Sequence, residues 1–100
     1  MGYSKLEYTF NDMDIVANKI CGTCLAELRK SVGLTQVNLA ERLGVPQSFI
    51  SKVETGERSL KLYEQFDYAA ALGIEVHDLV SAVESALDRG QQPREATKAG

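Results

Sequence analysis

The sequence has few residues of the kinds that bind metals or perform catalysis, with only two cysteines and one histidine among 100 residues. A structural zinc site needs four ligands, and Cys21, Cys24 and His77 supply three. His77 also has no serine or cysteine nucleophile in evident partnership, so nothing supports a catalytic triad. We therefore expect a protein that is not an enzyme and that binds no metal and no cofactor.

The two cysteines form a Cys-Gly-Thr-Cys motif, Cys21 to Cys24, within the apolar stripe of a predicted helix. A redox-active pair with this spacing usually lies at the start of a helix, where the helix dipole lowers the thiol pKa. We interpret both cysteines as core residues. A redox-sensing role is the alternative hypothesis.

Long apolar runs are also missing, because no stretch approaches the roughly 18 residues of a membrane span. No basic-then-apolar signal peptide opens the chain. We therefore expect a cytoplasmic protein with no membrane partner. The length and the 44% hydrophobic content fit one globular domain with a modest core. A domain of this size buries about 60–65% of its surface on folding, so a dimer interface would add useful stability.

An excess of basic residues is lacking as well, since the net charge is −3. The charges are unevenly distributed, however. Residues 27–61 include six basic and four acidic residues, whereas residues 62–100 include three basic and seven acidic ones. A locally positive segment in an acidic chain suits a specific DNA binder with few phosphate contacts. The acidic side chains of the C-terminal half are interpreted as a solvated face that avoids DNA, formed by Glu64, Asp67, Glu75 and Asp78.

The residue pattern predicts an all-α domain of five helices. Residues 5–10 alternate polar and apolar side chains, so we expect a short N-terminal arm there, either a strand or irregular. Apolar residues at helical spacing, with glycine terminators, predict helices over about 12–32, 35–44, 46–55, 62–72 and 76–87. The expected parts are an arm at 1–11, a helix-turn-helix domain at 12–88 and a flexible polar tail at 89–100.

The segment Gly33–Leu60 contains two of these helices, joined by a tight turn. Its apolar residues lie where two packed helices need them, and its outward positions are polar, namely Gln36, Gln47, Ser48, Ser51 and Lys52. Such a second helix suits the major groove, where Gln can bind adenine and Lys can bind guanine. Gln36, beside free backbone N–H groups at a helix start, and Arg58, in the following loop, are predicted to contact phosphates.

This part of the chain resembles the helix-turn-helix domain of phage Cro and repressor proteins and their bacterial relatives in the xenobiotic-response-element family. The resemblance covers about residues 25–79 and rests on motifs at the expected spacings: Leu28-Arg29, Gly33-Leu34-Thr35-Gln36, Leu39-Ala40, Leu43-Gly44-Val45, Ile50-Ser51, Glu54, Gly56, Arg58 and Ala71-Leu72-Gly73. It implies a five-helix lambda-repressor-like bundle whose third helix enters the major groove, usually as a homodimer on a two-fold related operator.

The resemblance also assigns roles to individual residues. Gln36 matches the family's phosphate-contacting glutamine, and Arg29 and Glu54 match a pair that forms a buried ion pair in some members. The base-reading positions hold Gln47, Ser48, Ser51 and Lys52.

Two residues depart from the family pattern. Pro46 replaces a common Ser or Thr cap and removes a hydroxyl that could bind phosphate. Phe49 is large for a position near the groove, and it either contacts a thymine methyl group or packs.

The sequence thus predicts a sequence-specific DNA-binding transcriptional regulator, such as a repressor, on a palindromic operator. The alternatives are an antitoxin that binds both operator DNA and a toxin protein, and an interaction module that has lost DNA binding. We expect homodimerisation through the last helix and also the N-terminal arm, because the last helix has more apolar residues than a small bundle needs: Val76, Val80, Val83 and Leu87.

Overall fold

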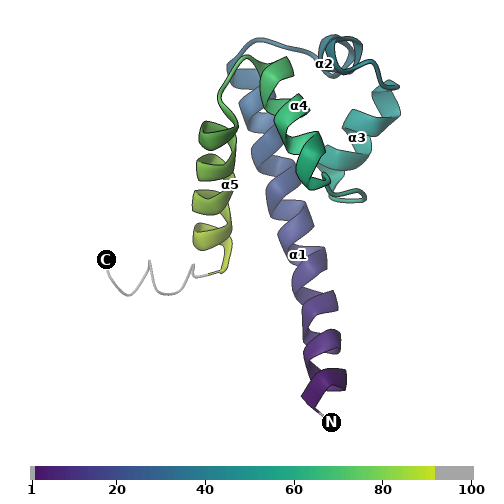
Figure 1. Ribbon diagram of the computed structural model, residues 1–100, viewed down its shortest axis with the longest axis vertical. Coiled ribbons are helices and arrows are strands. Elements are labelled where there is room, and N and C mark those ends of the chain that lie inside the picture. Colours follow the sequence, from purple (N-terminus) through teal and green to yellow (C-terminus); the bar gives the residue numbers. More distant parts are fainter. Residues whose placement is uncertain (1, 92–100) are drawn as a thin grey trace.

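The computed structural model describes residues 2–91, with side chains described for residues 15–90. It contains five helices, α1 (Gly2–Ser31), α2 (Gln36–Leu43), α3 (Gln47–Thr55), α4 (Leu62–Leu72) and α5 (Val76–Gln91), as Figure 1 shows. No strand occurs in the described part of the chain. The predicted all-α, five-helix class is therefore confirmed.

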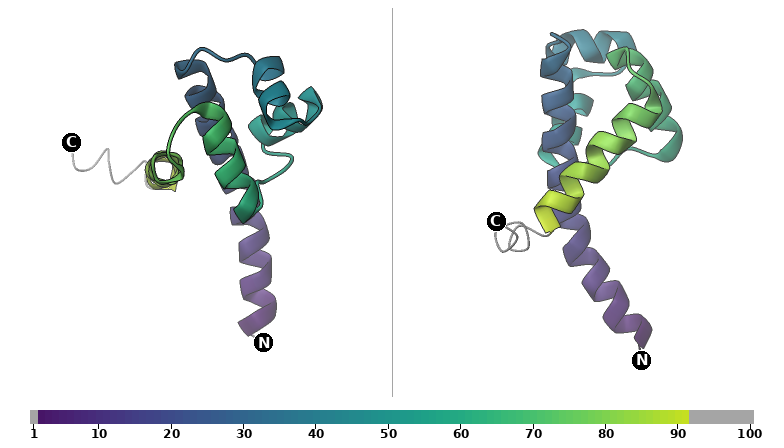
Figure 2. Two further views of the ribbon diagram at one scale, coloured as in Figure 1. Left: turned by 45° about the horizontal axis from the view of Figure 1, so that its top comes forward. Right: turned by 90° about the vertical axis from the view of Figure 1, so that its left-hand side faces the viewer.

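The N-terminal segment differs from the prediction, because residues 5–10 belong to α1 and form neither a strand nor an irregular arm. Both views of Figure 2 show the first half of α1 extending beyond the other helices. A helix satisfies its backbone hydrogen bonds within the segment, whereas a strand needs a neighbouring strand, which the described residues do not provide. The helix therefore begins about ten residues earlier than the pattern predicted.

The C-terminal boundary also differs from the prediction. Helix α5 continues to Gln91, four residues beyond the predicted end at Leu87. The remainder of the predicted tail, residues 92–100, lies outside the described residues.

The two central helices begin and end at residues whose local chemistry fixes the boundary. Thr35 caps α2: its side chain accepts a hydrogen bond from the Asn38 backbone N–H at 3.0 Å, and the Asn38 side chain accepts one from the Thr35 N–H at 3.2 Å. Gly44 then ends α2 in a left-handed conformation with φ 71°, which only glycine adopts readily. Pro46 precedes α3 as its N-cap, without a side-chain capping bond.

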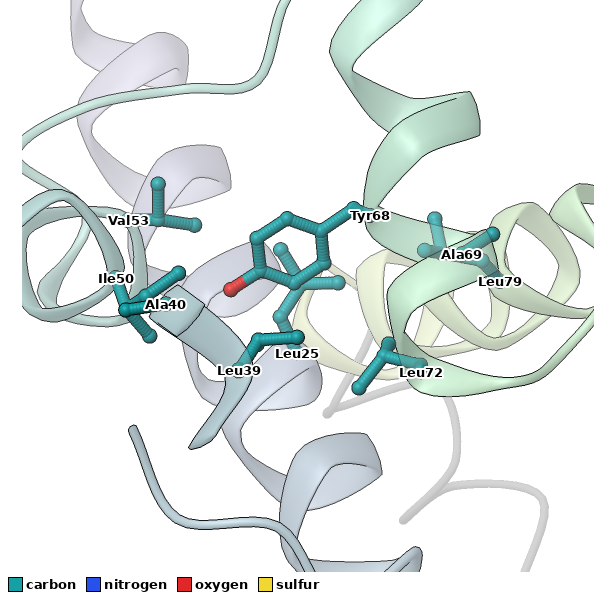
Figure 3. Packing of buried hydrophobic residues seen from close by; sticks show 9 residues of the cluster. All are labelled: Leu25, Leu39, Ala40, Ile50, Val53, Tyr68, Ala69, Leu72 and Leu79. Carbon is teal, nitrogen blue, oxygen red and sulfur yellow. The ribbon is translucent and has the colours of Figure 1, made fainter. Parts of the chain in front are cut away.

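The core lies where α1 to α5 meet, and Figure 3 shows its residues converging from all five helices. Tyr68 of α4 is fully buried at its centre, and its hydroxyl has no hydrogen-bond partner among the described residues. The members of the core are Leu25, Leu39, Ala40, Ile50, Val53, Tyr68, Ala69, Leu72 and Leu79. Because α2 and α3 contribute Leu39, Ala40, Ile50 and Val53, their inner faces are fixed and their polar faces remain outside.

Helix α1 touches α3 very closely at Gly22. A Cβ atom on Gly22 would lie 2.5 Å from the carbonyl oxygens of both Val53 and Glu54. Only glycine allows the two backbones to approach this far without displacement. Gly22 therefore sets how α3 sits on the long helix.

Helix α5 covers the other side of α1 and contributes Leu79 to the core. Four apolar residues of α5 were predicted to form a dimer surface. Of these, Val76, Val83 and Leu87 are partly buried within the domain, and Val80 is 46% exposed. Most of the apolar face of α5 is thus buried within its own domain.

Within the described residues, none of the helices has the length and apolarity needed to traverse a membrane.

Candidate nucleic-acid interface

The helix-turn-helix presents its predicted contact residues on one polar surface. Gln47, Ser48 and Lys52 of α3 are exposed, and Ser51 is partly exposed one turn beyond Gln47 and Ser48. Gln36, the first residue of α2, is also partly exposed. The structure therefore brings Gln36 beside the outward face of α3.

A chain of hydrogen bonds connects this surface to the interior. The Gln47 Nε2 group donates to Gln36 Oε1 at 3.2 Å, and Gln36 Nε2 donates to Glu54 Oε1 at 2.8 Å. Glu54 in turn accepts from the Arg29 Nε group at 2.7 Å and from its Nη2 group at 3.1 Å. The side-chain amides of Gln36 and Gln47 are therefore oriented by a buried ion pair on α1 and α3.

The ion pair between Arg29 and Glu54 is almost completely enclosed, since the two side chains are 9% and 6% exposed. The remaining Nη1 group of Arg29 donates to the Leu34 carbonyl oxygen at 2.8 Å, which links α1 to the loop before α2. The hydrogen bond from Arg29 to Glu54, opposed by burial, raises the pKa of the guanidinium. Because both charges have several hydrogen-bond partners, the pair connects α1, α2 and α3 rigidly.

Arg58 and Phe49 form a second cluster at the edge of this surface. The guanidinium carbon of Arg58 lies 4.3 Å from the centroid of the Phe49 ring, a cation–π geometry. Phe49 is partly buried and packs against the core, so its ring has a structural role. Its contact with a thymine methyl group remains a prediction.

Arg58 also forms an ion pair that the sequence analysis did not predict. Its Nη1 and Nη2 groups donate to Glu64 Oε1 and Oε2 at 2.9 and 3.0 Å. The prediction of a solvated acidic face is therefore wrong for Glu64, whose side chain is 17% exposed and paired with Arg58. The sequence did contain a signal that Glu64 is held in place. Glu64 lies three residues after Lys61, at the start of α4, where an acidic side chain often accepts a hydrogen bond from the backbone N–H of the cap residue.

The two cysteines lie three residues apart on α1 and line different hollows. Cys21 lines a cavity of about 170 Å³ between α1, the α3–α4 loop and α5, whereas Cys24 lines a different groove beside Ala86 and Arg89. Both thiols are free, and burial raises the pKa of each, which disfavours the reactive thiolate.

His77, the third candidate metal ligand, is exposed on α5. The described residues contain no group of three or more His, Cys, Asp or Glu side chains placed to hold a metal ion.

Comparisons with known proteins match the same part of the chain. The family described as Helix-turn-helix matches residues 25–79. An uncharacterized HTH-type transcriptional regulator of Sinorhizobium fredii, y4dJ, is 35% identical over 63 residues, which span 63% of this chain and 82% of that protein.

Two solved structures are similar in sequence as well as in fold. The restriction-modification controller protein C.AhdI of Aeromonas hydrophila is 38% identical, with a TM-score of 0.57 over 61% of this chain and 92% of its own. An XRE-family like protein of Pseudomonas syringae pv. tomato is 36% identical, with a TM-score of 0.62 over 80% of this chain and 94% of its own. The residues that the family comparison matches, 25–79, include α2, α3 and the hydrogen-bonded surface between them.

Proposed function

Because this chain belongs to the Cro/repressor-type helix-turn-helix family, we propose that it is a transcriptional regulator that reads a specific DNA sequence with α3 in the major groove. The observation that supports this best is the hydrogen-bonded series from Gln47 through Gln36 to Glu54. It holds a candidate base-contacting amide and a candidate phosphate-contacting amide side by side on one surface. The names of similar proteins, which are transcriptional regulators, agree with this function.

The residues divide into two roles in this proposal. Gln47, Ser48, Ser51 and Lys52 face base edges. The hydrogen bond that Gln47 donates to Gln36 restricts the rotation of the Gln47 amide before DNA arrives. Gln36 and Arg58 contact phosphates on either side of the groove. A restrained amide loses less side-chain entropy on binding, so its bidentate contact with adenine discriminates more strongly.

We further propose that the protein binds as a homodimer on a palindromic operator with half-sites about one helical turn apart. The candidate dimer surface includes Val80 of α5, 46% exposed, and Leu62 and Phe66 of α4, 72% and 54% exposed. Gln65, which lies between the two α4 residues in the sequence, lines the same cavity as Val80. Burying the three apolar side chains against a second copy would remove apolar surface from water.

Selection of binding sites from a random duplex library tests this function. We expect enrichment of a two-fold symmetric sequence, with Gln47→Ala and Lys52→Ala relaxing the base preference at a cost of about 1–3 kcal/mol on the selected site. The matched control is Lys30→Ala, which removes an exposed lysine side chain from α1 and leaves the α3 surface unchanged. No enriched sequence, or equal effects of all three substitutions, would contradict the proposal.

A further inference from the structure

Glu64 lies in the first turn of α4, and its side chain bonds to Arg58 in the loop that follows α3. One carboxylate oxygen, Oε1, accepts from the Lys61 backbone N–H at 2.8 Å and from Arg58 Nη1 at 2.9 Å, and Oε2 accepts from Arg58 Nη2 at 3.0 Å. The side chain is 17% exposed and that of Arg58 is 32% exposed. The carboxylate is therefore held by α4 itself, while the guanidinium remains open to solvent on one side.

The donors of Arg58 are partly used in this arrangement. A guanidinium has five N–H donors, and Arg58 directs three hydrogen bonds to the Glu64 carboxylate and to the Ser59 carbonyl oxygen. The Phe49 ring covers one face of the guanidinium. The positive charge of Arg58, a predicted phosphate contact, is thus neutralised within its own domain. The positive charge of Lys52, a predicted base contact, is not, because Lys52 forms no ion pair with any described residue.

We propose that Glu64 competes with a DNA phosphate for Arg58, and thereby limits both the affinity of the protein for DNA and the dependence of that affinity on salt. This inference rests on the proposed DNA-binding function. Phosphate binding releases a counterion only to the extent that the protein supplies net positive charge at the contact. With Glu64 in place, the contact offers an almost neutral pair, and the carboxylate repels the incoming phosphate.

The same geometry could serve stability alone, and the two roles predict different results. A surface ion pair that only stabilises α4 affects unfolding and leaves DNA binding unchanged. A competing carboxylate affects DNA binding through Arg58, so its effect disappears when Arg58 is removed. Coupling between the two residues in DNA affinity is therefore the decisive measurement.

The test measures binding of the full chain to its selected duplex at several salt concentrations between 50 and 200 mM. Glu64→Gln removes the charge and keeps an oxygen that can accept the Lys61 N–H. We expect tighter binding at 50 mM salt, with a slope of log affinity against log salt that is steeper by about 0.9, so that affinity falls about 3-fold further over this range than for the wild type. Thermal unfolding of each variant verifies that the domain remains folded.

Two comparisons complete the experiment. Asp67→Asn removes a charge from an exposed residue of the same helix that has no hydrogen bond to Arg58, so it measures the general effect of lowering the negative charge. Glu64→Gln in an Arg58→Ala background is expected to give no gain beyond that of Asp67→Asn. Equal affinities and slopes for Glu64→Gln and Asp67→Asn in otherwise wild-type protein overturn this inference and leave the proposed function intact. Absence of any specific duplex for the wild type overturns both.

Discussion

The side-chain amide of Gln47 donates to Gln36 Oε1 at 3.2 Å, which joins the first residue of α3 to the first residue of α2. Because Gln36 is held in turn by Glu54 at 2.8 Å, the order of the outer surface depends on an ion pair buried between α1 and α3. Stability of the fold and arrangement of the binding surface are therefore connected at Glu54.

The ion pair gives the first prediction. Arg29→Ala or Glu54→Ala should lower the free energy of unfolding by about 3–5 kcal/mol, because each change leaves the other charge buried and without its partner. Urea denaturation measures this loss, with the exposed Lys30→Ala as control. The double variant should lose less than the sum of the two single variants, and strict additivity would show that the pair does not interact.

Tyr68 gives a prediction of the opposite sign. Its hydroxyl is buried without a hydrogen-bond partner in the part of the chain that the structure describes, and burial raises its pKa, so the group remains neutral. Tyr68→Phe should raise the free energy of unfolding by about 1 kcal/mol, since an unsatisfied buried hydroxyl costs about 1–3 kcal/mol. The contrasting variant is Tyr68→Ala, which should lose about 3–5 kcal/mol by creating a cavity. A clear loss of stability in Tyr68→Phe would mean that the hydroxyl has a partner.

Gly22 gives a prediction about the contact between α1 and α3. Gly22→Ala should lower the free energy of unfolding by about 1–3 kcal/mol, because the new methyl group would meet two backbone carbonyl groups that cannot rotate away. The control is Gly90→Ala, where the atoms nearest to the added Cβ belong to the Ile20 side chain, with its flexible Cδ1 end the closest. Thermal denaturation compares the two, and an equal or larger loss in Gly90→Ala would contradict the close contact at Gly22.

The last prediction concerns acid. The Arg58 guanidinium, together with the Lys61 backbone N–H, lowers the pKa of Glu64 from 4.5 to about 2. A carboxyl group whose pKa is lower in the folded state stabilises that state above its unfolded pKa, and the contribution is lost as the pH falls through the folded value. Wild type should therefore be more stable than Glu64→Gln above about pH 5, and the difference should shrink between about pH 4.5 and pH 2. Denaturation curves at pH 7, 4 and 2 measure it, and a difference independent of pH would contradict it.

Much of the fold could be predicted from the sequence because its signals are local. Thr35 and the glycines at 44, 56 and 73 mark helix ends through their own backbone preferences, and the structure places the four glycine-terminated boundaries, including Gly33, at positive φ. The prediction of a strand or an irregular arm at residues 5–10 is wrong because the local signal there is too short. Six residues are too few to separate a strand period from a helical one, and only the continuity with the rest of α1 decides between them.

The sequence by itself determined the number of helices, the ends of the helices other than the start of α1 and the end of α5, and the polar character of the outward face of α3, because these depend on residues close together in the chain. Only the tertiary structure decided which polar groups bond to one another. The family resemblance already implied the pair of Arg29 and Glu54, but it did not indicate that Gln36, 18 residues before Glu54, joins that pair. Nor did it indicate that Glu64 neutralises Arg58 while Lys52 stays exposed. Contacts of this kind depend on how the helices pack, and that packing is fixed by distant residues such as Gly22 rather than by the pattern along the chain.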